Sequence, residues 1–171
     1  MTESEVIDAL LQSFDRHQSR ILAFVRSRAS FEDWLTWEAY YYALERGWTA
    51  AVKPRYHDLG SSRVQSFADL FIEIPDTKCK IVFEFKIVGT CTLNKYRSSI
   101  DADVVKLKTL DETRCCRVLL LFLFSEYPNI LGRAEWTNWL NELSFWGPSA
   151  PYQHVMDKTQ GYEAVLQGWI V

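Results

Sequence analysis

Apolar residues in the first part of the chain recur at the spacing of an α-helix. They alternate with charged residues and predict a helix over residues 3–27. The residues that carry this pattern are Val6, Leu10, Phe14, Ile21 and Val25. A second helix is expected to begin after Ser30, because Ser30 and Asp33 match the capping-box pattern, and to end at Gly47.

The pattern then changes to that of strands. Residues 48–56 alternate weakly between apolar and polar positions and include Pro54, which favours an edge strand. Residues 67–74 and 80–88 each read as a strand, and the turn residues 75–77 between them predict a hairpin.

Helix and strand patterns alternate in the rest of the chain. A helix is predicted over residues 99–112, where Asp101 and Asp103 would favour its N-terminus. Residues 117–124 are almost entirely apolar, as in a strand covered on both faces in the middle of an α/β sheet. The remaining predicted elements are a helix over 132–143 and a short strand within 162–171.

This order of elements predicts one α/β domain over residues 1–171, with a mixed central sheet flanked by helices. A length of 171 residues and a hydrophobic fraction of 48% suit one domain with a sizeable core. We expect a cytoplasmic protein without a membrane partner, because no signal peptide or membrane-length apolar stretch is present. The four cysteines form no CxxC pair, so a zinc site is not expected.

Two charged residues interrupt the strand predicted at 80–88. Side chains alternate between the two faces of a strand, so Glu84 and Lys86 share one face with Val82 and Val88. The opposite face is wholly apolar. A charge in such a strand is costly unless it is paired or bound to a metal ion. The alternative is an exposed sheet face on which Glu84 and Lys86 pair with each other.

Asp69 interrupts the preceding predicted strand in the same way. If the two strands form a hairpin, Asp69 and Glu84 can lie close together on one face. Two carboxylates in such a position raise each other's pKa unless a cation lies between them. Hard oxygen ligands favour Mg²⁺ or Mn²⁺, which also bind the phosphates of substrates.

The spacing of these residues resembles the signature of the PD-(D/E)XK nuclease superfamily. Asp69 is followed, after fourteen residues, by the sequence Glu84-Phe85-Lys86. Ala68 stands where many members of the family have proline. The family core is a helix, three strands, a helix and a strand, and the order predicted over residues 31–124 is the same.

The resemblance implies a restriction-endonuclease-like fold and a metal-dependent nuclease that hydrolyses phosphodiester bonds, with DNA endonuclease activity the favoured form. Asp69 and Glu84 would bind Mg²⁺ or Mn²⁺ through their carboxylates, and the backbone carbonyl of Phe85 could add a ligand. Lys86 would orient the attacking water or stabilise charge on the phosphate. The expected partner is nucleic acid, although nothing in the sequence separates DNA from RNA.

Three further residues are candidates for the same site. Glu38, on the predicted helix before the sheet, could bind a second metal ion or a metal-bound water, or could be a partly exposed helix charge. Lys106 and Lys108 lie on the helix after the motif, where the family often has a residue that contacts phosphate. For either lysine alone, the pattern favours a solvated helix residue.

A second hypothesis is an inactive protein on the same fold that serves as a protein-binding immunity or regulatory module. The net charge of −3 and the abundant aromatic residues suit such a role. The acidic balance also argues against a large surface for coating DNA. A homodimer is a further expectation, since cutting two strands requires two sites.

Overall fold

The computed structural model describes residues 1–27, 29–90, 93–125, 127, 129–143, 145, 152–156 and 163–171, with the backbone alone described at 93 and 94. The helices are α1 (Glu3–Ser13), α2 (Gln18–Ser27), α3 (Glu32–Glu45), α4 (Leu93–Leu107) and α5 (Ala134–Asn141). The strands are β1 (Thr49–Val52), β2 (Leu70–Glu73), β3 (Lys80–Gly89), β4 (Cys116–Ser125), β5 (Tyr152–Met156) and β6 (Glu163–Ile170). Within these ranges, no helix combines the length and the apolar character needed to cross a membrane.

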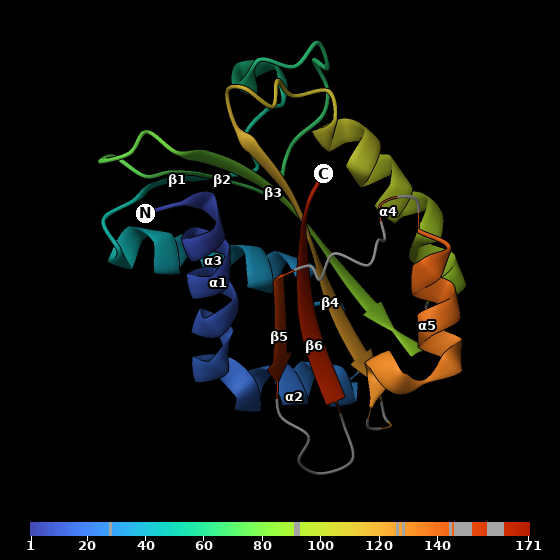
Figure 1. Ribbon diagram of the computed structural model, residues 1–171. Helices are drawn as coiled ribbons and strands as arrows, with labels where there is room; N and C mark the ends of the chain where they lie inside the picture. Colours follow the sequence, from blue (N-terminus) through green and yellow to red (C-terminus); the bar gives the residue numbers. More distant parts are fainter. Residues whose placement is uncertain are drawn as a thin grey trace.

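The strands form one six-stranded sheet in the order β1-β2-β3-β4-β6-β5. β3 and β4 are parallel, whereas the other neighbouring pairs are antiparallel. Helices α1, α2 and α3 cover one face of the sheet, and α4 and α5 cover the other (Figure 1). The prediction of an α/β fold with a mixed sheet flanked by helices is therefore confirmed.

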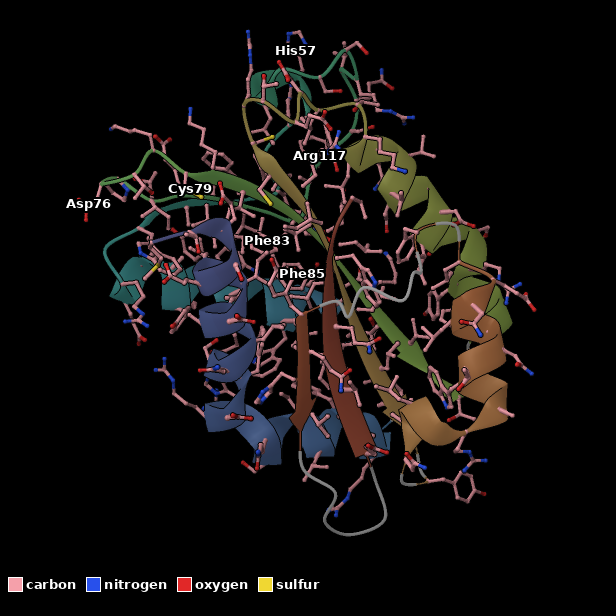
Figure 2. The ribbon with its side chains drawn as sticks, in the orientation of Figure 1. His57, Asp76, Cys79, Phe83, Phe85 and Arg117 are labelled. Atoms are coloured by element: carbon pink, nitrogen blue, oxygen red, sulfur yellow. The ribbon has the colours of Figure 1, made fainter. Side chains whose placement is uncertain are left out.

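The two central strands bury both of their faces, which the sequence predicted for β4. In β3, Phe83 and Phe85 pack in the core beneath α1 and α3 (Figure 2), whereas Val82 and Val88 pack in the core beneath α4 and α5. In β4, successive residues alternate between the same two cores. The predicted hairpin of β2 and β3 and the edge position of β1 are also confirmed.

The structure corrects three of the predicted helices. The first is divided into α1 and α2 by the 3-10 turn Phe14–His17. Just before this turn, the Ser13 hydroxyl donates to the carbonyl of Leu10 and so competes with the regular hydrogen bonds of the helix. The Ser30 capping box is wrong, because α3 begins at Glu32, with Phe31 at its N-cap and no side-chain cap.

The third correction concerns the helix after the motif. α4 begins at Leu93, six residues before the predicted start, and ends at Leu107. Asp101 and Asp103 therefore lie in its C-terminal half, so their predicted role at the helix N-terminus is wrong. The structure also adds β5, which the weak pattern of the tail did not predict.

Gly47 adopts a conformation that favours glycine after α3. Its φ is +73°, and a Cβ atom there would meet nothing within 4 Å. Gly47→Ala should therefore lower the free energy of unfolding by about 1 kcal/mol through backbone strain alone. Gly47→Asn should cost less, because Asn tolerates this conformation. Urea denaturation of both variants tests this, and an alanine variant as stable as the wild type would contradict it.

Candidate functional site

Asp69 lies where β2 and β3 separate. The β2–β3 register ends at the pair Leu70 and Phe83. One residue further, the amide of Asp69 donates to the carbonyl of Phe83 at 3.2 Å. The Asp69 side chain then takes the place of a strand partner, because its Oδ2 accepts the amide hydrogen of Phe85 at 2.8 Å. This bond fixes one carboxylate of the motif beside the Glu84-Phe85-Lys86 segment.

Glu84 is buried, with 2% of its surface exposed. The Tyr56 hydroxyl donates to Oε1 at 2.7 Å, and the Lys106 ammonium lies 3.4 Å from the same oxygen. Burial, and next the charge of Asp69, raise the pKa of Glu84 to about 8, although Lys106 and Tyr56 act in the opposite direction. Glu84 therefore holds a proton at neutral pH unless another cation approaches it.

Lys86 joins three elements. Its Nζ lies 3.4 Å from Oε1 of Glu32 at the start of α3 and 3.1 Å from Oδ2 of Asp103 on α4. Burial opposes its charge, but these two carboxylates outweigh burial, so the pKa of Lys86 is raised. The alternative of an exposed Glu84–Lys86 pair is wrong, because both side chains are largely buried and the ion pairs described for them are with other residues.

Lysines and carboxylates alternate through the rest of the site. Lys53 forms an ion pair with Asp69, and its Nζ lies 3.6 Å from Oδ1 of Asp33. Nζ of Lys106 lies 2.5 Å from Oδ1 of Asp103. We call the whole group the acid–lysine cluster. It consists of Glu32, Asp69, Glu84, Asp103, Lys53, Lys86 and Lys106.

The charge of the acid–lysine cluster suits an added cation. Apart from the exposed Asp33 beside Lys53, four carboxylates face three ammonium groups, so the cluster is negative when every group is ionised and neutral when Glu84 keeps its proton. Carboxylate oxygens are the donors that Mg²⁺ and Mn²⁺ prefer. A divalent ion that displaced the Glu84 proton would remove the repulsion between Glu84 and Asp69.

Asp69, Glu84 and the carbonyl of Phe85 are the groups that could hold such an ion. The amide of Phe85 points toward Asp69, and in a strand the carbonyl of the same residue faces the same edge. Lys53 now compensates Asp69, and its side chain is 46% exposed, so it has room to withdraw. Among the described residues, no three His, Cys, Asp or Glu side chains are already gathered as a metal site.

The structure does not bring Glu38 or Lys108 to the acid–lysine cluster. Glu38 pairs with His17 at 3.1 Å and with Arg20 at 3.5 Å. It lies six residues after Glu32 on α3, which is about one and two-thirds turns, so it faces another side of the helix. Lys108 is exposed beyond the end of α4. Lys106 reaches the cluster, as expected of a residue on this helix.

Sequence reasoning missed four residues of this region: Glu32, Lys53, Tyr56 and Asp103. Asp103 could have been found, because it precedes Lys106 by three residues, which is the spacing of neighbours on a helix. Glu32 lies on the same helix as Glu38, the acidic residue predicted from the sequence, but on a different face of it. Lys53 and Tyr56 lie outside the regular strands, where periodicity carries no signal.

Tyr56→Phe tests the bond to Glu84. Tyr56 is fully buried, and its hydroxyl bonds most strongly to an ionised carboxylate. We expect the loss of unfolding free energy to be about 2 kcal/mol at pH 9, where Glu84 is ionised, and smaller at pH 6. Tyr41→Phe, at an exposed position, is the matched control. Urea denaturation at both pH values measures the difference, and an equal loss at the two would contradict it.

Comparisons with known proteins found no match to this chain among family models, curated proteins or solved structures.

Proposed function

We propose that this protein is a metal-dependent nuclease that hydrolyses phosphodiester bonds, most directly a DNA endonuclease. The observation that supports this most strongly is the bond from the Phe85 amide to the Asp69 carboxylate. It holds Asp69, directly before β2, beside Glu84 on β3, and Lys86 follows on the same face of β3 as Glu84. Asp69, fifteen positions before Glu84 in the sequence, thus lies next to the segment that carries Glu84 and Lys86.

The cost of this arrangement also supports a functional role. A buried carboxylate whose pKa is raised to about 8 by burial and by nearby acids destabilises the folded state at higher pH. An uncharged side chain would pack at this position without that cost. Strained or costly groups of this kind gather at functional sites.

Each residue has a distinct role in the proposed reaction. Asp69 and Glu84, with the carbonyl of Phe85, would hold Mg²⁺ or Mn²⁺, which supplies positive charge to the phosphate and makes water more acidic. Lys86 is held by Glu32 and Asp103, so its ammonium is positioned to orient water or to stabilise charge on the phosphate. Lys106 lies beside Glu84 and could contact the same phosphate.

The restriction-endonuclease-like fold is part of the same proposal. From Glu32 to Ser125 the α-helices and strands follow the order helix, three strands, helix and strand. This is the order of the PD-(D/E)XK core. In this proposal, the helices α1, α2 and α5 and the strands β5 and β6 are additions to that core.

A protein-binding module with an inactive site is the second candidate. The observation that favours it is a row of exposed apolar residues on α3, where Trp37, Tyr41 and Leu44 are 47%, 57% and 44% exposed. The same surface could form the expected homodimer. A protein-binding role does not require metal binding, so the assay below separates it from a nuclease.

Cleavage assays test the proposed function. Plasmid, linear duplex, single-stranded DNA and RNA would each be incubated with Mg²⁺, Mn²⁺ or a chelator. We expect the wild type to cut DNA only with metal. The Asp69→Asn variant should cut at least about 100-fold more slowly. Asn keeps an oxygen that can accept the Phe85 amide, so the fold should persist. Asp76→Asn, in the exposed turn before β3 (Figure 2), is the matched control. Metal-independent cutting, or no cutting of any substrate, would contradict the proposal.

A further inference from the structure

A second feature of the molecule is a cavity at the beginning of β3 and β4. It has a volume of about 660 Å³, within the range of about 300–1,000 Å³ that is usual for small-molecule sites. Its walls come from the 3-10 turn His57–Leu59, from β2 and β3, and from the segment before β4. Figure 2 shows His57 at this end of the molecule.

The rim of the cavity is cationic. Lys78, Lys80 and Arg114 line it, and Asp58 is the one acidic residue among the lining residues described. Two of the cations have distant or exposed carboxylate partners, since Lys80 lies 3.9 Å from Glu73 and the exposed Arg114 lies 3.4 Å from Asp111. For Lys78, the described residues offer no carboxylate within ion-pair distance. The rim thus has positive charge available for an anionic ligand.

The floor of the cavity is apolar. Leu59, Phe71 and Val82 are its apolar lining residues, and Phe71 is an aromatic residue that is only partly buried. A ligand that fits both parts must combine an anionic group with a flat, largely apolar body. A nucleotide has both, because its phosphate suits lysine and arginine and its base can stack on an aromatic ring.

The cavity lies next to the acid–lysine cluster. Val82 precedes Glu84 by two residues and shares its face of β3, so the two are separated by roughly 7 Å along the strand. Tyr56 bonds to Glu84, and the next residue, His57, lines the cavity. Two residues adjacent in the sequence, Tyr56 and His57, therefore contact the acid–lysine cluster and the cavity, respectively.

We propose that this cavity is a nucleotide-binding subsite. The phosphate would bind at Lys78, Lys80 and Arg114, with the base over Phe71. Its assignment to a nucleotide next to the cleaved bond rests on the proposed nuclease function, whereas binding of the nucleotide itself does not. A single nucleotide or one unit of a strand would present the same chemistry to the cavity.

Calorimetric titration in the presence of chelator tests this binding separately from catalysis. The probes are adenosine 5′-monophosphate, adenosine, inorganic phosphate and a short single-stranded oligonucleotide. We expect saturable binding of the monophosphate, at least about tenfold tighter than binding of adenosine or phosphate alone, because only the nucleotide contacts both rim and floor. Tighter binding of the oligonucleotide would identify a strand as the source.

The double variant Lys78→Asn/Arg114→Gln should weaken nucleotide binding by at least about tenfold. Asn suits position 78, where φ is +58°. Arg16→Gln, an exposed arginine beside α1, is the control and should bind like the wild type. Absence of saturable nucleotide binding, or binding that the double variant leaves unchanged, would overturn the inference. Cleavage without nucleotide binding would leave the proposed function standing, and nucleotide binding without cleavage would overturn only the nuclease.

Discussion

Glu84→Gln is expected to reduce metal-dependent cleavage by at least about 100-fold and, at the same time, to make the folded protein more stable at high pH. The first effect follows from the loss of a metal-binding carboxylate beside Asp69. The second follows from burial, because a neutral amide avoids the cost of an ionised carboxylate in a site where 2% of the residue is exposed.

The sign of the pH effect follows from the raised pKa of Glu84. The folded protein holds the Glu84 proton up to about pH 8, whereas the unfolded chain releases it near the ordinary value of 4.5. The unfolded state therefore binds fewer protons between these values, and the stability of the wild type falls as pH rises through this range. Gln removes this dependence, so the variant should gain roughly 2–5 kcal/mol relative to the wild type between pH 5 and pH 9.

Urea denaturation at pH 5, 7 and 9, together with cleavage rates, measures both effects. Glu73→Gln is the control, because Glu73 is a partly buried strand carboxylate outside the acid–lysine cluster. A structural role for Glu84 predicts the opposite result at pH 9, a loss of stability on substitution. Full activity in the Gln variant would contradict its assignment as a metal ligand.

Lys86→Met should be the most destabilising single change in the acid–lysine cluster. It removes the ammonium between Glu32 and Asp103, whose side chains are 29% and 7% exposed, and leaves them without this compensating charge. Removing one partner of a buried ion pair costs about 3 kcal/mol or more. We also expect cleavage to fall below detection, because the positioned ammonium is lost.

The pH dependence and a double variant distinguish this cause from a packing defect. Burial raises the pKa of Glu32, so protonation of Glu32 relieves part of the unpaired charge, and the loss of unfolding free energy should be smaller at pH 5 than at pH 8. Lys86→Met/Asp103→Asn should recover part of the stability but none of the activity. A loss that is equal at both pH values and not relieved by Asp103→Asn would contradict the electrostatic explanation.

The sequence was sufficient to predict much of the sheet and the motif. Strict alternation placed Phe83 and Phe85 on one face of β3 and Glu84 and Lys86 on the other, because the period of a strand leaves no other choice. The apolar run of β4 predicted burial on both faces. Both inferences rest on local geometry, which the sequence determines directly.

The remaining residues of the site depend on how distant elements pack. Glu32 contacts Lys86 across 54 positions of sequence and Tyr56 contacts Glu84 across 28, and neither contact has a local signal. Lys53 follows β1 in a left-handed conformation, with φ at +50°. The choice of Glu38 rather than Glu32 failed because the rotation of α3 against the sheet is set by tertiary packing.

Metal binding is the property on which the proposed function depends. Titration of Mn²⁺ into the wild type and Asp69→Asn, followed by calorimetry at pH 7, where Glu84 holds its proton, measures it without a nucleic acid substrate. We predict that the wild type binds Mn²⁺ saturably with release of a proton from Glu84, and that Asp69→Asn does not bind under the same conditions. No binding to the wild type, or equal binding to both proteins, would contradict a metal site at Asp69 and Glu84.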